Sequence, residues 1–205
     1  IYGVVANNYL LTQPANGQVI SIPSTITTFV TNELTQQSIK KYQWNTFITP
    51  VVLGESPYAL VSRVGIAYNY QDFKKLLQNP KRNINLASCS GSYELIYNLW
   101  ADTNLVDRRY VSSILYPNTP AIAMAVVGNQ TEFGILSLSS ALPLEQAGKL
   151  QILAVSSAIE KTPQMFENFD IQQGYMIALH PNTPTDIVTW FRREFVRDRK
   201  STRLN

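Results

Sequence analysis

The chain has 205 residues, of which 45% are hydrophobic and 15% are charged, a composition typical of a globular protein rather than a disordered one. Its net charge of +3 comes from the last nine residues, RDRKSTRLN, so residues 1–196 are neutral and offer no basic surface to a nucleic acid. No apolar run approaches the roughly 20 residues that cross a bilayer. The single cysteine excludes an intramolecular disulfide and a cysteine-based metal cluster.

Apolar runs of strand length alternate along the chain with segments of helical period. Most of these runs are apolar on both faces, which is typical of a sheet covered by helices on two sides. The predicted strands are Val19–Ile22, Thr49–Leu53, Tyr58–Ser62, Ile84–Ala87, Val111–Leu115, Phe133–Leu136, Gln151–Ser156 and Tyr175–Leu179. So regular an alternation predicts an α/β fold with mostly parallel sheets flanked by helices.

Several helices carry start signals. Asn69 is placed to cap a helix, with Asp72 three residues later. Thr119-Pro120 and Thr183-Pro184 each place a capping hydroxyl before a proline at the first helical position. A further apolar stripe at Leu95–Trp100 predicts a helix that begins just after a serine- and glycine-rich turn.

Small polar residues gather in four turns, 23–28, 88–92, 116–119 and 137–140, each directly after a predicted strand. In α/β sheets, ligands bind at the carboxyl ends of the strands. Free backbone N–H groups and hydroxyls at a helix N-terminus suit a carboxylate, and the helix dipole adds to the attraction. A single such turn is more typical of an ordinary helix cap, whereas four of them together support a shared ligand cleft as well as they support separate caps.

Catalytic interpretations have less support in the residues. The lone His180 lies before a proline with no acidic or cysteine partner nearby in sequence, so we interpret it as structural or solvent-facing. Cys89 lies in a polar turn before a helix, a position that lowers the pKa of a thiol, but no general base is evident. We interpret Cys89 as a small residue that fits a tight turn, with a cysteine hydrolase as an alternative. No metal or cofactor is predicted.

Five segments, in this order and spacing, resemble the solute-binding proteins of tripartite tricarboxylate transporters over most of residues 3–195. They are Pro14–Gly17 (PANG), Asn83–Ser92 (NINLASCSGS), Tyr116–Thr119 (YPNT), Ser139–Val155 (SSALPLEQAGKLQILAV) and His180–Pro184 (HPNTP). The fourth segment is the most specific of the five, because it is similar to the family pattern P-S-A-L-P-x-I-x-A-G-K-L-R-A-L-A-V.

The sequence also departs from the family pattern. The opening P-G-G loop and the E-N-R-P-G-A-G-G segment of the family would precede Gly3, so we expect an N-terminally truncated fragment. Ala125, Leu136-Ser137 and Gly174 stand where the family often has Asp, an Asp-Asn pair and Trp. Several of these positions are expected near the cleft, so the resemblance implies an unusual ligand or a divergent branch.

The resemblance implies a two-lobed fold of the periplasmic binding protein type II, in which the chain crosses between lobes twice. We place the crossings near Pro57–Tyr58 and Leu153–Val155. Lobe one is then expected to comprise residues 1–57 and 156–196, and lobe two residues 58–155. Residues 197–205 follow a helix expected to end near Phe195. Because DRKSTRLN resembles translated sequencing-adapter sequence, we interpret residues 197–205 as a non-native tail rather than a real basic one.

The implied function is that of a monomeric periplasmic receptor, not an enzyme, that captures a small organic carboxylate and delivers it to the permease subunits of a membrane transporter. Neutral hydrogen-bond donors, without a buried arginine, are expected to hold the anion. The predicted contacts are Ser24, Thr25 and Thr27 of lobe one and Ser88, Ser90, Gly91, Ser92, Tyr116, Asn118, Thr119, Ser137 and Ser139 of lobe two. The alternative is the effector-sensing domain of a transcription regulator, which has the same architecture.

Overall fold

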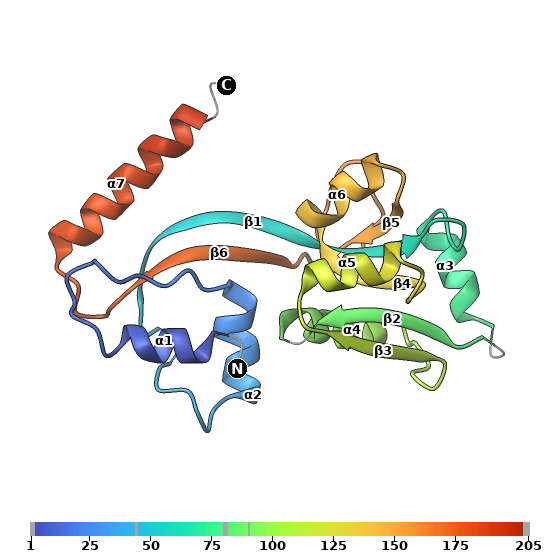
Figure 1. Ribbon diagram of the computed structural model, residues 1–205, viewed down its shortest axis with the longest axis horizontal. Helices are drawn as coiled ribbons and strands as arrows, with labels where there is room; N and C mark the ends of the chain where they lie inside the picture. The colour runs from blue at the N-terminus through green and yellow to red at the C-terminus, as the bar shows by residue number, and fades with distance from the viewer. Residues whose placement is uncertain (1–2, 44, 80–81, 90, 203–205) are drawn as a thin grey trace. The chain divides into compact units, whose positions relative to one another are not determined.

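The chain divides into two compact units, each described here by itself. Unit 1 comprises Ile1–Glu55 and Gly174–Asn205, and unit 2 comprises Ser56–Gln173. The computed structural model (Figure 1) describes residues 3–43, 45–79, 82–89 and 91–202, with side chains in the last helix as far as residue 197. The chain passes between the units on strand β1 (Ile48–Arg63) and again on strand β6 (Gln172–Leu179).

Unit 2 is built on a mixed sheet in the order β3-β2-β4-β1-β5. Strand β2 (Ile84–Cys89) runs parallel to β3 (Val111–Tyr116) on one side and to β4 (Phe133–Ser137) on the other. The crossing strand β1 is antiparallel to β4 and to β5 (Leu150–Val155). Helices α4 (Ser92–Thr103) and α5 (Thr119–Val127) both pack against β2.

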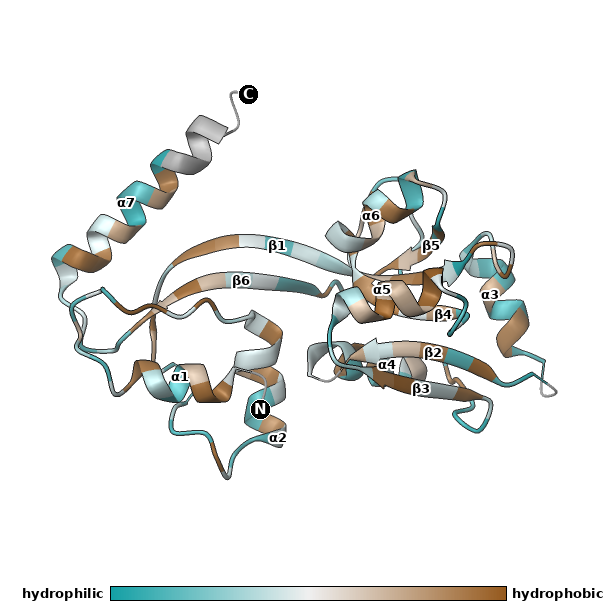
Figure 2. Ribbon diagram, in the orientation of Figure 1, coloured by the Kyte–Doolittle hydropathy of each residue, from teal (hydrophilic) through white to brown (hydrophobic). Residues whose placement is uncertain are grey.

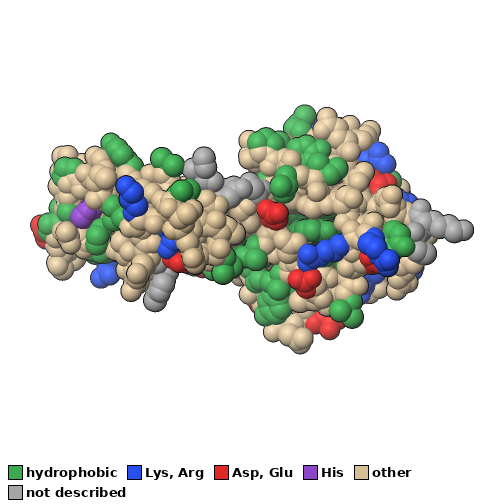
Figure 3. Space-filling view, turned by 90° about the horizontal axis from the view of Figure 1, so that it is seen from below, with side chains coloured by type: hydrophobic (Ala, Val, Ile, Leu, Met, Phe, Trp, Pro, Cys, Tyr) green, Lys and Arg blue, Asp and Glu red, His purple; other side chains and the backbone are tan. Residues whose placement is uncertain are grey.

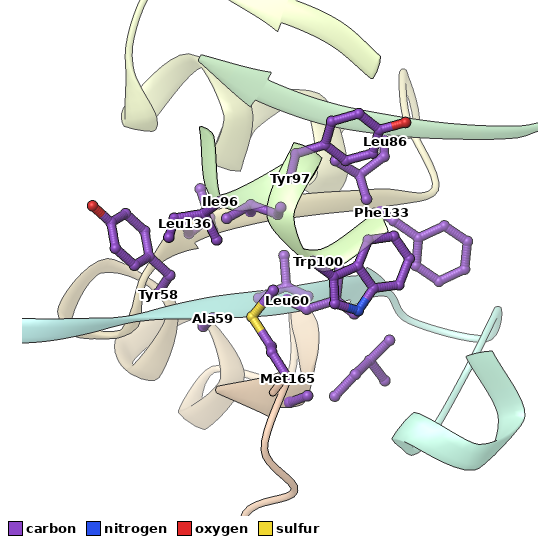
Figure 4. Close-up of a cluster of buried hydrophobic side chains, with 14 of the residues drawn as sticks. Tyr58, Ala59, Leu60, Leu86, Ile96, Tyr97, Trp100, Phe133, Leu136 and Met165 are labelled. Atoms are coloured by element: carbon purple, nitrogen blue, oxygen red, sulfur yellow. The ribbon is translucent and has the colours of Figure 1, made fainter. Parts of the chain in front are cut away.

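The core of unit 2 lies between this sheet and its helices (Figure 4). Trp100 of α4 and Phe133 of β4 are fully buried there. The fully buried Phe73 of helix α3 (Tyr70–Leu77) contacts both of them through its ring. Strand β1 contributes Tyr58–Val61 to the same core. Four consecutive buried residues on one strand mean that both faces of the sheet are covered there, as the apolar sequence of this segment predicts.

Unit 1 contains the first part of β1 and most of β6, with helices around them. Helix α1 (Val4–Leu10), a π-helical turn η1 (Thr27–Thr31) and helix α2 (Asn32–Thr35) come from the first part of the chain. Helix α7 (Thr185–Thr202) packs its first turns on β6, where Val188 and Phe191 join Ile177 and Leu179 in a small apolar cluster. In hydropathy colours, α7 shows hydrophobic stretches that alternate with hydrophilic ones along its length (Figure 2).

The second boundary between the units lies between Gln173 and Gly174, later in the chain than the expected crossing at 153–155. The intervening segment stays with unit 2 because its side chains complete that core: Met165 and Phe166 are buried in it. Backbone bonds also tie it to β5, since the N–H of Met165 donates to the carbonyl of Val155 at 2.7 Å and that of Ile171 donates to Ser156 at 2.7 Å.

Two strand predictions differ from the structure. The runs predicted as separate strands at 49–53 and 58–62 form the single strand β1, because Gly54 to Pro57 remain extended across the boundary between the units. The predicted strand Val19–Ile22 is wrong: it makes only an isolated bridge, Ser21 to Ala178, and a second bridge follows at Ser24. Without a continuous partner, an extended segment gains only a few ladder hydrogen bonds.

The expected end of the last helix near Phe195 is also wrong, because α7 continues to Thr202. Arginine and lysine are good helix formers, so the basic residues that follow Phe195 extend the helix once it has begun. Glu194 and Arg197, three residues apart, form an ion pair at 2.7 Å on this part of α7. Positive charge is also favoured near a helix C-terminus by the dipole.

Candidate ligand-binding site

Three helix N-termini lie at one edge of the sheet in unit 2. Strands β2, β3 and β4 are parallel neighbours, and each is followed directly by a helix: α4, α5 and α6 (Leu138–Gln146), respectively. The carboxyl ends of parallel strands meet at the same edge, so the N-terminal N–H groups of these helices are brought to that edge as well. The sheet order thus places the predicted turns 88–92, 116–119 and 137–140 together.

The start of α4 depends on a glycine. Gly91 has φ +85° and ψ −129°, a backbone conformation that is essentially confined to glycine, and it is the residue before the first turn of α4. No side chain caps this helix end. Gly91 and Ser92 are both buried, while the predicted contact Ser90 lies outside the described residues.

The start of α5 is capped by Asn118, not by Thr119 as the sequence predicts. The Oδ1 atom of Asn118 accepts a hydrogen bond from the backbone N–H of Ala121 at 2.9 Å. Thr119 is therefore the first helical residue, and Pro120 lies at the second position, where its missing N–H costs nothing. Asn118 is exposed, and Tyr116 and Thr119 are half-buried, so all three lie at the surface of unit 2. Helix α5 itself is apolar over most of its length (Figure 2).

A cluster of four serines surrounds the start of α6, and we call it the serine cluster: Ser56, Ser137, Ser139 and Ser140. The hydroxyls of Ser137 and Ser140 lie 2.7 Å apart, and the hydroxyl of Ser139 donates to Ser137 at 3.3 Å. Ser56 belongs to β1 and accepts the backbone N–H of Ser139 at 3.3 Å. Residues 138–140, expected as part of the polar turn 137–140, are instead the first residues of α6, a helix of nine residues.

Ser88 and Cys89 belong to the core of unit 2 rather than to its surface. Ser88 is fully buried, and its hydroxyl is hydrogen-bonded to that of Ser113 on the neighbouring strand at 2.8 Å. Burial raises the pKa of Cys89 to about 11, which outweighs any lowering by the nearby helix N-terminus. Because the thiol is protonated at neutral pH, Cys89 is unsuited to act as the nucleophile of a hydrolase.

In unit 1, Ser24 and Thr27 line a pocket of about 570 Å³ between α1 and the segment 19–24. The backbone carbonyl of Ser24 accepts the N–H of Thr28 at 2.9 Å, an α-type bond at the start of the helical segment that continues into η1. Thr25 does not line this pocket. Its hydroxyl accepts the N–H of Gly174 at 2.9 Å, so Thr25 anchors the residue at which the chain returns to unit 1 on β6.

No residue among the predicted contacts that the structure describes carries a charged side chain. Charged residues lie elsewhere as neighbouring pairs, including Arg82 with Glu132 at 2.7 Å and Arg108 with Asp102 at 2.6 Å. On the face seen in Figure 3, basic and acidic side chains are interspersed rather than gathered by sign.

His180 has a local structural partner, because its Nδ1 atom accepts the backbone N–H of Asn182 at 3.1 Å. Within the described ranges, no three histidine, cysteine, aspartate or glutamate side chains come together as a metal site would require. Among the same residues, no helix has both the length and the apolar character of a membrane-crossing segment.

Sequence reasoning missed Ser56 as a residue of this site. Its hydroxyl lies 3.4 Å from that of Ser139, although the two residues are 83 positions apart in the chain. A serine before a proline in an extended run is an ordinary linker signal. Only the pairing of β1 with β4, which brings Tyr58 opposite Ser137, places Ser56 beside the start of α6.

No protein-family model and no curated protein sequence matches the chain. Among solved structures, it superposes on R. palustris Rpa4515 with adipate at a TM-score of 0.79 and 19% identity, covering 91% of this chain and 65% of that one. It also superposes on MatC (Rpa3494) from Rhodopseudomonas palustris with bound malate at a TM-score of 0.79 and 17% identity, covering 95% of this chain and 69% of that one. For a TctC solute-binding protein from Polaromonas without ligand, the TM-score is 0.70 at 22% identity, and the superposition covers 95% of this chain and 68% of that one.

The chain has the fold of a TctC-type solute-binding protein. The predicted fold class, a two-lobed α/β fold of the periplasmic binding protein type II, is thereby confirmed. The chain spans about two thirds of the length of these TctC-type structures.

Proposed function

We propose that this chain is a receptor for a small organic carboxylate. The observation that carries the proposal is the convergence of three helix N-termini, α4, α5 and α6, at the carboxyl edge of three parallel strands in unit 2. Each N-terminus presents backbone N–H groups and the positive end of a helix dipole. An anion is therefore the ligand that this edge suits best.

Neutral donors can hold such an anion without a charged side chain. Hydrogen bonds to a charged group contribute about 1.5–3 kcal/mol each, so a few of them supply useful affinity. Of the predicted contacts that the structure describes at this edge, the side chains of Tyr116, Asn118, Thr119 and Ser139 are exposed or half-buried. We propose that these four, with the backbone N–H of Ser92, bind the carboxylate at this edge of unit 2.

The chemical class of the ligand is supported by the structures that share the fold. Two of them contain dicarboxylates, adipate in Rpa4515 and malate in MatC. The broader role follows the same comparison: we propose that the protein acts in the periplasm and delivers its ligand to the permease subunits of a tripartite tricarboxylate-type transporter. Nothing in the fold or in these comparisons supports the alternative of an effector-sensing domain of a transcription regulator.

A thermal-shift screen followed by calorimetry tests the carboxylate proposal. The panel contains adipate, malate, citrate and benzoate, each paired with its uncharged amide as the matched control. We expect at least one carboxylate to raise Tm and to bind with a measurable Kd, because ligand binding to the native state alone stabilises it. Its amide is expected to bind far more weakly. If every carboxylate leaves Tm unchanged, or if the amides bind equally well, the proposal is wrong.

A further inference from the structure

Helix α6 lacks a side-chain cap from its own N-terminal residue. Ser137 occupies the capping position, but its side chain makes no hydrogen bond to the first turn. Its hydroxyl is instead paired with those of Ser139 and Ser140. The orphan backbone N–H groups of a helix start need a partner, and an unpartnered one weakens the first turn.

Ser56 of β1 supplies that partner from a distant part of the chain. Its hydroxyl oxygen accepts the backbone N–H of Ser139, the second residue of α6, at 3.3 Å. It also lies 3.4 Å from the hydroxyl of Ser139 and 3.3 Å from the carbonyl of Pro57. One side chain on a strand thus holds both the backbone and the hydroxyl of Ser139.

Ser56 lies on β1 where the chain passes from unit 1 to unit 2, so its contact links α6 to this crossing strand. Ser56 is the first residue of unit 2 on β1, directly after Glu55, the last residue of unit 1 in this passage. Two residues later, Tyr58 pairs with Ser137 in the sheet, so the backbone close to Ser56 is held against β4. The start of α6 is therefore anchored to the strand on which the chain passes from one unit to the other.

We infer that Ser56 is a positioning residue for the carboxylate site, acting through Ser139. By capping α6 from the crossing strand, it keeps the first turn of this helix ordered and the Ser139 hydroxyl in a fixed place before the ligand arrives. A preorganised donor binds more tightly because no ordering cost is paid on binding. The inference rests on the proposed function, since it assigns Ser56 a part in that same site.

The test compares Ser56→Ala, Ser56→Thr and Asn69→Ala with the wild-type chain. Asn69 is the matched control, because its side chain caps α3 in the same unit by accepting the N–H of Asp72 at 2.9 Å. Helix α3 follows the end of β1, which is antiparallel to β4, so this cap lies away from the carboxyl edge of the parallel strands. Each variant is titrated with adipate, malate, citrate and benzoate, and its Tm is measured without ligand.

Ser56→Ala is expected to weaken binding of the carboxylate that binds the wild type by about tenfold, the equilibrium effect of losing one helix cap. Ser56→Thr, which keeps the hydroxyl, should restore most of the affinity. Asn69→Ala should lower Tm and leave Kd unchanged. If Ser56→Ala lowers Tm but binds like the wild type, Ser56 is only a structural cap and the inference is wrong. If the wild type binds none of the four compounds, the proposed function fails first and the inference fails with it.

Discussion

The indole N–H of Trp100 donates a hydrogen bond to the hydroxyl of Tyr70 at 3.0 Å and so links helix α4 to helix α3 inside unit 2. Trp100 is fully buried and Tyr70 is nearly so. The Tyr70 hydroxyl in turn donates to Oδ1 of Asn104 at 3.3 Å. Each polar atom of this chain of side chains has a partner, as buried polar groups require.

Tyr70→Phe is expected to lower the free energy of unfolding by about 1–3 kcal/mol, because the buried indole N–H of Trp100 loses its acceptor while little volume is lost. Urea denaturation followed by tryptophan fluorescence measures this change. The matched control is Tyr68→Phe, since Tyr68 is 65% exposed and should change stability by less than about 0.5 kcal/mol. Equal effects of the two substitutions would contradict the assigned hydrogen bond.

The pKa of Cys89 predicts that unit 2 loses stability in alkali. Burial raises the pKa of this thiol in the folded protein to about 11, from an ordinary value of 9.0. Between these two values the folded state holds a proton that the unfolded state has released, so the free energy of unfolding falls as pH rises from about 9 towards 11. The full loss is on the order of 1–3 kcal/mol.

Urea midpoints measured between pH 7.5 and 10.5 test this dependence, with Cys89→Ala as the comparison. The variant is expected to lose less stability than the wild type across the window from pH 9 upward. Buried Tyr70 and Tyr97, whose pKa values are also raised, remain in both proteins and add the same downward trend at the alkaline end. Parallel curves for the two proteins would show that Cys89 does not titrate as described.

Asn118→Asp separates capping from ligand binding at the start of α5. Aspartate caps a helix as well as asparagine does, so stability should change by less than about 0.5 kcal/mol. The added negative charge should repel a bound carboxylate and raise its Kd at least about tenfold, an effect that salt reduces. Asn69→Asp, the same change at the cap of α3, should leave Kd unchanged. Equal Kd values for the two variants would place Asn118 away from the ligand.

Gly91→Ala is expected to cost more than Gly148→Ala. Gly148 has φ +65° with nothing within 4 Å of an added Cβ, so alanine there costs about 1 kcal/mol of left-handed backbone strain. Gly91, at φ +85° and ψ −129°, lies in a region that side chains avoid, and a cost of about 2 kcal/mol or more is expected. Chemical denaturation of both variants measures the difference, and a smaller loss for Gly91→Ala would contradict the conformation described for it.

The elements that local sequence could predict are those whose signals lie within a few residues. The Asn69 cap and the helix it begins are confirmed, because both partners of the capping bond lie in one turn of chain. The strands at Ile84, Phe133 and Tyr175 are confirmed as well, since their extensive burial leaves a mostly apolar run. The strand at Val111 is also confirmed, although it lies at the edge of the sheet and is largely exposed. The prediction that Thr119 caps α5 is wrong because another good capping residue, Asn118, immediately precedes it and takes the capping position.

The candidate site was predictable in part for the same reason. The polar turns after β2, β3 and β4 are visible as local composition, and parallel pairing brings them to one edge. Burial is not local: Ser88 looks like its neighbours in sequence, yet its position in the sheet pairs it with Ser113. Thr25, likewise, is bonded to Gly174, on a segment 149 residues away.

By itself, the sequence determined the alternation of strands and helices, the neutral polar turns and the likeness to solute-binding proteins, because periodicity, caps and turn residues act over a few positions. Only the tertiary structure decided that residues 156–173 complete the core of unit 2, and that Ser56 supports the first turn of α6. Such contacts join residues far apart in the chain, and their existence depends on the path of the whole backbone rather than on any local preference.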